Sequence, residues 1–392
     1  MNGRTGLVTP PSLVVGTERS ATRLELFFDL AFVLAVARTA DRLGRDLDLS
    51  GAALFLGLVT VVWWAWASST LYANRFDTDD LVYRGLKLAG MLAVIGLAAS
   101  ASEATTTRST VFALCYVALR LLLVGQYARA WRHVPEARPS VRIYLRAHAA
   151  SAGLWLVSVP MPEPWRYVAW GAGVTIEMAA PLLSTRGPGD VPLHLSHLPE
   201  RFALFVILVL GESVTAIVDG LTDADWRAPA VVAAGLAFLV TAGLWWSYFD
   251  LAGGAAKKAL QEAGPSSRHE VHDVYLYAHL PIAAGLIAVG VGLEHAIVEA
   301  GHGMLSDGTR WTLAGGVALY LATATVLTSG LAARKRGRWS GLGLGAPVAV
   351  TFGLLDRVPP AATLGLMAAL MTVLVVAGLT QSQTGRLDAT PV

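Results

Sequence analysis

The sequence is poor in cysteine and in charged residues. It holds one cysteine, Cys115, among 392 residues, which excludes an internal disulfide and any zinc site built from several thiolates. Asp, Glu, Lys and Arg together make up 15% of the chain, against roughly a quarter in ordinary soluble domains. This shortage excludes a soluble enzyme. Lysine is also scarce, since 26 of the 30 basic residues are arginine, and we interpret this bias as the mark of a GC-rich bacterial genome.

Apolar residues are abundant instead. They make up 54% of the chain, and the mean hydropathy is +0.54. Apolar runs long enough to cross a bilayer as helices recur along almost the whole sequence. We therefore predict an all-α polytopic membrane protein with about twelve transmembrane helices, at residues 24–43, 50–72, 82–101, 109–130, 143–160, 164–184, 200–219, 229–250, 271–297, 310–331, 339–356 and 360–380.

The distribution of basic residues predicts the orientation. Seventeen Lys and Arg residues fall in the tails and loops on the side of the two termini, and seven fall on the opposite side. Because cytoplasmic loops carry the excess of basic residues, we expect both termini in the cytoplasm of a bacterium, with the protein in the inner membrane. The net charge of +2 comes from scattered residues, so no nucleic acid is expected as a partner.

Several aromatic residues lie in the later halves of two predicted helices. At this depth, near the cytoplasmic surface, amphipathic rings favour the zone of the lipid headgroups. A cage that stacks a ligand is the alternative. The residues are Trp63, Trp64, Trp66, Tyr72, Trp245, Trp246 and Tyr248.

The two halves of the chain resemble each other. Glu25-Leu-Phe27 aligns with Glu200-Arg-Phe202, Trp63-Trp64 aligns with Trp245-Trp246, and Lys87-Leu88 aligns with His279-Leu280. These matches keep their order, so they indicate an internal repeat rather than a chance likeness of apolar helices. We expect two parallel six-helix repeats, at 24–184 and 200–380, with a linker at 185–199 and cytoplasmic tails at 1–23 and 381–392.

The first predicted helix begins with two acids. Glu25 and Asp29 are four residues apart and therefore lie on one face of the helix, where they could form a cation port. Alternatively, Glu25 stabilises the amino end of the helix and Asp29 pairs with a buried arginine.

The seventh predicted helix carries Glu200, Arg201 and Glu212. In the repeat alignment Glu212 falls beside the position that matches Arg38, so we predict an ion pair between Arg38 and Glu212.

Two basic residues occupy matched positions in the third and ninth predicted helices. They are Lys87 and His279, and the histidine could relay protons or be satisfied by a neighbouring helix. Arg120 and Glu177 could neutralise each other. The glycines Gly285, Gly290 and Gly292 predict close helix packing. We recognise no catalytic triad, no phosphate-binding loop and no metal-ligand motif, so we expect no cofactor and no metal.

Three segments resemble the bacterial low temperature requirement A family. They are Glu25-Leu-Phe-Phe-Asp29, the run from Glu200 to Ser213, and His279-Leu-Pro281. The resemblance covers nearly the whole chain and implies a polytopic inner-membrane protein, with Glu25, Asp29, Glu200, Arg201, Glu212 and His279 as the matching polar positions. The segment Arg23 to Asp29 is also similar to the Arg-x-x-x-Phe-Ser-Asp opening of the endolysosomal two-repeat cation channels, with Phe28 in place of the serine.

These patterns lead to two hypotheses on function. The first is conduction or transport of a small ion or solute between the two repeats, with a pathway that uses Glu25, Asp29, Arg38, Lys87, Glu200, Arg201, Glu212 and His279. The second is a membrane-embedded structural or stress-adaptation factor, or a lipid-modifying enzyme, without transport. Expected partners are membrane lipids, the small ion or solute and a second copy in a homo-oligomer.

Overall fold

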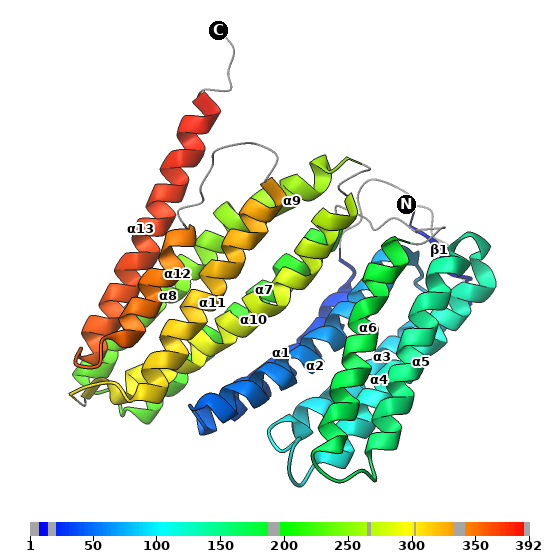
Figure 1. The fold of residues 1–392 in the computed structure, drawn as a ribbon, viewed down its shortest axis with the longest axis horizontal. Helices are drawn as coiled ribbons and strands as arrows, with labels where there is room; N and C mark the ends of the chain where they lie inside the picture. Colours follow the sequence, from blue (N-terminus) through cyan, green and yellow to red (C-terminus); the bar gives the residue numbers. More distant parts are fainter. Residues whose placement is uncertain are drawn as a thin grey trace. The chain divides into compact units, whose positions relative to one another are not determined.

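The fold is described from a computed structural model. The structure describes residues 8–14, 21–186, 197–264, 268–301, 303–332 and 342–387, and nearly all of them are helical (Figure 1). Most of the predicted linker at 185–199 and the ends of both predicted tails lie outside these residues.

Helices occupy all of the predicted membrane segments. Their bounds are α1 Arg23–Arg45, α2 Leu49–Arg75, α3 Leu81–Ala101, α4 Ser109–His133, α5 Arg138–Ser158, α6 Trp165–Thr185, α7 His197–Asp223, α8 Ala228–Trp246, α9 Gly253–Glu262, α10 Arg268–Val298, α11 Asp307–Ala332, α12 Leu342–Leu354 and α13 Pro360–Leu387. Short helical segments η1 Pro135–Ala137, η2 Ser247–Ala252 and η3 Glu299–Gly301 follow α4, α8 and α10.

Eight helices of the described chain are long and apolar enough to span a membrane. One of the eight is a continuous helix of 35 residues, Ala228–Glu262, which α8, η2 and α9 form together. Counted in this way, the described residues contain twelve helices. The remaining four are α1, α5, α6 and α12, which are more polar or, for α12, only 13 residues long. Polar residues such as Asp29, His148 and Glu177 lower the hydropathy of α1, α5 and α6, and all three are buried within the protein.

The outer faces of the helices carry large apolar side chains. Leu92 on α3 is 71% exposed and Val373 on α13 is 63% exposed, and many similar residues line other helices. Contiguous exposed apolar surface is rare on soluble proteins and is what lipid requires. These faces fit a protein that is surrounded by acyl chains.

One predicted loop is wrong. Lys257 and Lys258 fall between the predicted helices 229–250 and 271–297, but η2, a π-helical segment, continues α8 into the helix α9, which contains both residues. Ala, Lys, Leu, Gln and Glu in α9 are all good helix formers, and Ala256 and Leu260 bury an apolar edge. Hydropathy marks where a segment leaves the bilayer, not where its helix ends.

The chain divides into two compact units. Unit 1 comprises Met1–Thr39 and Gly57–Arg201, and unit 2 comprises Ala40–Leu56 and Phe202–Val392. Three helices, α1, α2 and α7, therefore contribute residues to both units.

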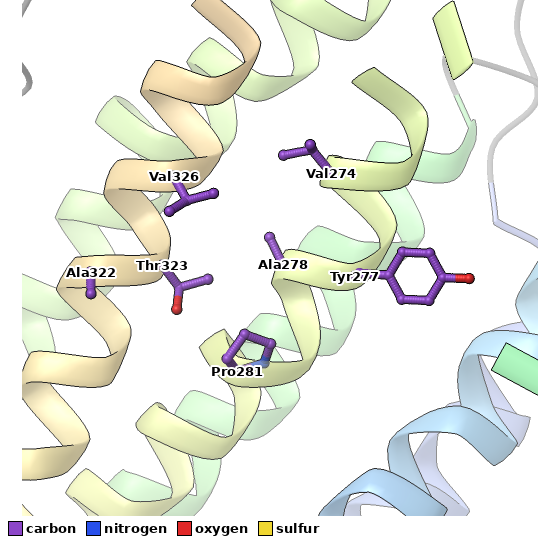
Figure 2. Close-up of a pocket in the computed structure, with 7 residues that line it drawn as sticks. All are labelled: Val274, Tyr277, Ala278, Pro281, Ala322, Thr323 and Val326. Carbon is purple, nitrogen blue, oxygen red and sulfur yellow. The ribbon is translucent and has the colours of Figure 1, made fainter. Parts of the chain in front are cut away.

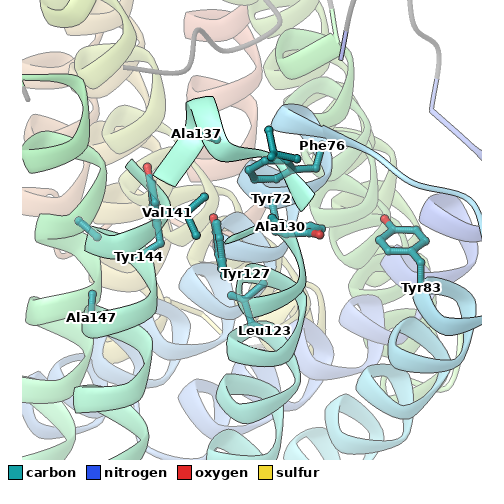
Figure 3. Packing of buried hydrophobic residues seen from close by; sticks show 12 residues of the cluster. Tyr72, Phe76, Tyr83, Leu123, Tyr127, Ala130, Ala137, Val141, Tyr144 and Ala147 are labelled. Atoms are coloured by element: carbon teal, nitrogen blue, oxygen red, sulfur yellow. The ribbon is translucent and has the colours of Figure 1, made fainter. Parts of the chain in front are cut away.

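In unit 1, helices that follow one another in sequence pack side by side from α3 to α6. Buried aromatic side chains fill the space between α2, α4 and α5 (Figure 3). The rings of Tyr127 and Tyr144 lie parallel with centroids 5.1 Å apart, and Trp155 stacks on Trp170 at 4.6 Å. Offset stacks of this kind add to the stabilisation from buried area, so they fix the positions of the polar groups among them.

A small sheet at one end of unit 1 involves a segment that was predicted as a tail. Strand β1, Ser12–Leu13, pairs antiparallel with β2, Phe76–Asp77, which directly follows α2. Nearby, Asp80 accepts hydrogen bonds from the backbone amide of Thr9 (2.9 Å) and from Arg129 Nη1 (2.9 Å). The N-terminal segment is thus attached to the ends of α2 and α4.

Asp80 predicts a pH dependence of stability. Burial alone would raise its pKa, but hydrogen bonds from Arg129, Tyr83 and Thr9 outweigh burial and lower its pKa from 3.8 to about 2. A lowered pKa stabilises the folded state above the unfolded pKa, and this contribution is lost as pH falls through the folded pKa. We expect the Asp80→Asn variant to be less stable than wild type by about 2 kcal/mol at pH 7.

Thermal unfolding in detergent micelles between pH 7 and pH 2 checks this prediction. The Tm difference between wild type and Asp80→Asn should shrink as pH falls from 3.8 towards 2. The control is Asp79→Asn, which alters an exposed carboxylate beside Arg84 and should change Tm little. A Tm difference for Asp80→Asn that is constant across this range would contradict the assignment.

In unit 2, α10 and α11 approach closely at glycines. A Cβ atom on Gly292 would lie 2.8 Å from Leu313, and one on Gly285 would lie 2.9 Å from the Gly316 carbonyl oxygen. Gly290 faces the backbone of Ser213 on α7. The prediction that these α10 glycines serve close helix packing is confirmed.

Candidate functional site

The first acid of α1 is part of the helix cap. The Thr22 amide donates to Glu25 Oε2 at 3.0 Å, and the Glu25 amide donates to Thr22 Oγ1 at 3.2 Å. This reciprocal pair is a capping box, which satisfies two amides that a helix start leaves without partners. Glu25 therefore stabilises the beginning of α1, which matches the structural alternative for this residue.

The second acid, Asp29, is bound by two donors. It is 2% exposed, and its Oδ1 accepts from Arg201 Nη2 at 2.7 Å and from Trp66 Nε1 at 2.9 Å. Among the described residues, Asp29 Oδ2 and Arg201 Nε and Nη1 are buried without a hydrogen-bond partner. The structure thus brings together two of the predicted site residues, Asp29 and Arg201, from positions 172 residues apart in the chain.

Lys87 lies near the same carboxylate. Its Nζ is 4.4 Å from the centre of the Phe28 ring and 5.7 Å from that of Tyr83, and its charge attracts Asp29. An aromatic face stabilises a desolvated cation by about 2 kcal/mol. We call Asp29, Trp66, Lys87 and Arg201 the Asp29 cluster.

The other predicted residue of the α7 start, Glu200, is half-buried. Its Oε1 accepts from the Ala21 amide at 3.5 Å, so it lies beside the segment that leads into α1. This contact is long and weak for a hydrogen bond. Glu200 is positioned near the beginning of α1 and is not a member of the Asp29 cluster.

His279 in unit 2 has partners on both ring nitrogens. Nδ1 lies 2.6 Å from the Tyr275 carbonyl oxygen and Nε2 lies 2.8 Å from the Tyr248 hydroxyl. Because a carbonyl only accepts, Nδ1 carries a hydrogen in this contact, and in the neutral ring Nε2 accepts from Tyr248. Neighbouring groups thus satisfy both ring nitrogens of His279, as in the structural alternative for this residue.

The surroundings of Lys87 and His279 correspond. Each lies four residues after a tyrosine that it contacts, Tyr83 for Lys87 and Tyr275 for His279 at 4.6 Å. Each also contacts a phenylalanine of the first helix of its half, which is Phe28 for Lys87 and, for His279, Phe202 at 4.8 Å. The repeat alignment pairs Phe202 with Phe27, which is one position before Phe28, the residue that contacts Lys87.

The second helix of each half adds a hydrogen-bond donor. Trp66 and Tyr248 are 182 positions apart, the same offset as the paired tryptophans. Trp66 donates to Asp29, and Tyr248 forms a hydrogen bond with His279. Similar side chains at matched positions therefore surround a polar group within each unit.

The prediction that Trp66 and Tyr248 lie in the zone of the lipid headgroups is wrong. Both are buried, as are Trp63, Trp64 and Tyr72, whereas Trp245 and Trp246 are each 45% exposed. Lipid and protein interior are both apolar, so hydropathy alone could not distinguish inward-facing rings from lipid-facing ones.

The predicted pair of Arg38 and Glu212 stays a prediction. Arg38, which is exposed, belongs to unit 1, and Glu212, which is half-buried, belongs to unit 2.

The predicted pair of Arg120 and Glu177 is confirmed. Arg120 Nη1 donates to Glu177 Oε2 at 2.8 Å, and both side chains are 0% exposed. Tyr116 donates to the same oxygen at 3.1 Å, and Ser68 accepts from Arg120 at 2.9 Å. His148 Nδ1 lies 3.6 Å from Glu177 Oε1. Nothing in the sequence pattern marks Ser68 and Tyr116 as members of this network.

A groove on unit 2 between α10 and α11 is apolar. It is lined by Val274, Tyr277, Ala278, Pro281, Ala322, Thr323 and Val326 (Figure 2). The hydroxyl of Thr323 already donates to the Leu319 carbonyl, and no charged side chain lines the groove. Such a surface suits an acyl chain and offers nothing to an ion, so the candidate site remains the Asp29 cluster.

Comparison with known proteins decides the family. A family model described as bacterial low temperature requirement A protein matches residues 20–377. The chain belongs to the bacterial low temperature requirement A family. The match covers both units, including all eight predicted site residues, and with the eight apolar helices it establishes a multi-pass membrane protein.

The chain is also similar to an uncharacterized protein of Rhizobium meliloti (strain 1021). The two sequences are 28% identical over 286 residues, and the alignment covers 70% of this chain and 69% of the relative.

Proposed function

We propose that this protein carries a small ion or solute across the bacterial inner membrane, along a path that uses α1 and α7 and the Asp29 cluster. The observation that carries the proposal is the buried ion pair of Asp29 and Arg201. Ionisable residues inside membrane proteins are costly and usually mark ion or substrate paths. The proposed orientation places both termini in the cytoplasm.

The unused hydrogen-bonding atoms of Asp29 and Arg201 support the binding and release of an ion at this pair. Asp29 Oδ2 and two nitrogens of Arg201 have no partner. Leaving buried polar atoms unsatisfied costs about 1 to 3 kcal/mol for each group. A proton or a cation that binds Asp29 would weaken its attraction for Arg201 and would occupy the unpaired oxygen, so ion binding and breakage of this pair would be coupled.

The corresponding surroundings of Lys87 and His279 support two six-helix repeats at 24–184 and 200–380. Transporters with parallel repeats often place their sites where the repeats meet. In this proposal, Asp29, Trp66 and Lys87 belong to one repeat, and Arg201 and His279 belong to the other. Lys87 and His279 then give the two repeats different polar groups at equivalent positions.

A structural role is the second candidate. The capping box of Glu25 stabilises the start of α1, and the fully buried pair of Arg120 and Glu177 joins α4 to α6, so charged residues here also serve the structure. If Asp29 and Arg201 do only this, the protein is a membrane-embedded structural or stress-adaptation factor, or a lipid-modifying enzyme.

Flux in proteoliposomes tests the proposal. Vesicles that contain folded protein are loaded with a pH dye and challenged with a panel of monovalent and divalent cations. We expect wild type to move protons or one of these cations and Asp29→Asn to lose at least about 90% of the rate, since a carboxylate on the path cannot be replaced by an amide. Asp79→Asn, an exposed carboxylate, should keep the wild-type rate. Absence of flux for every ion would favour the structural role.

A further inference from the structure

Arg75 is a buried cation that has no hydrogen-bond partner among the described residues. It is the last residue of α2 and is 2% exposed. Within this part of the chain, its Nε, Nη1 and Nη2 atoms are all buried without a hydrogen bond. Its guanidinium carbon lies 4.8 Å from the centre of the Tyr144 ring. A cation–π contact stabilises this charge but accepts none of its N–H groups.

Two other buried arginines of unit 1 are paired with carboxylates. Arg120 pairs with Glu177 at 2.8 Å and Arg201 pairs with Asp29 at 2.7 Å. No carboxylate in the described part of the chain forms such a pair with Arg75. The carboxyl end of α2 carries a partial negative charge, which offsets part of the cost of burying the charge of Arg75. However, none of the carbonyl oxygens of the described residues accepts a hydrogen bond from the guanidinium.

A hydroxyl with unused hydrogen-bonding capacity belongs to the same aromatic cluster as Tyr144. Tyr127 is fully buried, and its hydroxyl has no hydrogen-bond partner among the described residues. Its ring stacks on that of Tyr144 at 5.1 Å, and the Tyr144 ring is the one that Arg75 contacts. Figure 3 shows Tyr127 and Tyr144 side by side. Ser140, one turn before Tyr144 on α5, has a buried hydroxyl that is also unpartnered.

We propose that Arg75 and the Tyr127 hydroxyl bind a small monovalent anion of halide size inside unit 1. One uncompensated positive charge calls for one negative charge. The guanidinium has only donors, and a hydroxyl can donate, so a monatomic anion accepts from both in any direction. Water would satisfy these hydrogen bonds but would leave the charge of Arg75 in place.

The site is held at the end of the unit by the small sheet. The Val14 amide donates to the Arg75 carbonyl oxygen at 3.1 Å, and β2 begins at the next residue. The backbone of Arg75 is therefore fixed on one side by β1 and on the other by α2. Fixed donors bind an anion without a cost of ordering.

Thermal unfolding of the purified full-length protein tests this site. Chloride replaces gluconate at constant ionic strength, and Tm is measured for wild type, Arg75→Met and Arg138→Met. We expect the Tm of wild type to rise with chloride and to saturate, because the anion binds only the folded state. Arg75→Met should lose the rise and, without chloride, should unfold at a higher temperature than wild type. Arg138, an exposed arginine over the Trp131 ring, is the matched control and should keep the rise.

A second variant keeps the test decisive if Arg75→Met does not fold. Tyr127→Phe removes one hydrogen-bond donor, and we expect it to raise the chloride concentration at half-saturation by about tenfold. A wild-type Tm that is independent of chloride, or an unchanged chloride response in either variant, would overturn the proposal. Because the experiment measures Tm and not flux, it tests the anion site whether or not the protein transports an ion.

Discussion

Replacing Glu177 by glutamine should lower the free energy of unfolding by about 3 to 5 kcal/mol, the usual cost of breaking a buried ion pair. The variant leaves Arg120 charged, with 0% exposure and no carboxylate in contact. Tyr116 would keep a partner in the amide oxygen, but a neutral acceptor does not neutralise the guanidinium. Thermal or denaturant unfolding in detergent micelles measures the effect.

Two further variants separate the charge from the packing. The double variant Arg120→Met with Glu177→Leu removes both charges and should recover most of the lost stability, because apolar side chains of similar volume often replace a buried pair without loss. Glu103→Gln alters an exposed pair with Arg108 and should change stability by less than about 1 kcal/mol. If Glu177→Gln were as mild as Glu103→Gln, the pair would not be buried as described.

The second large effect concerns Asp29. Asp29→Asn should destabilise the protein by about 3 kcal/mol or more, since it leaves Arg201 buried without its carboxylate. The indole of Trp66 can still donate to the amide oxygen, so the loss comes from the charge. The same unfolding measurements apply.

The double variant Asp29→Asn with Arg201→Gln is the matched control for this change. It removes both charges, keeps the shape of the Asp29 side chain, places a shorter neutral amide at position 201 and should recover at least half of the lost stability. Failure of Arg201→Gln to restore any stability in the Asp29→Asn background would show that the two residues do not act as a pair.

Much of the fold could be predicted because the bilayer imposes a simple rule on helices. Long apolar runs located the membrane segments, and their glycines indicated where α10 packs closely. The helix α9 was missed because it is polar enough to resemble a loop, although its residues favour helix. The pairing of β1 with β2 rests on two residues in each strand, too few to give a pattern.

The site was only partly predictable for a physical reason. Asp29, Arg201 and Lys87 stand out in sequence because charges are rare in apolar helices. Their partners do not, since Trp66 lies on a helix that is apolar on every side. Glu25 was ambiguous because an acid at a helix start serves a cap and a cation port equally well, and only the contacts with Thr22 decide.

The most direct test of the central claim is the flux carried by the double variant Asp29→Asn with Arg201→Gln in proteoliposomes. The variant is chosen because restored stability separates folding from function. If the Asp29 cluster lies on the path, the double variant should be folded and should still lose at least about 90% of the wild-type flux. Wild-type flux in this folded variant would contradict the account and would show that Asp29 and Arg201 only hold α1 and α7 together.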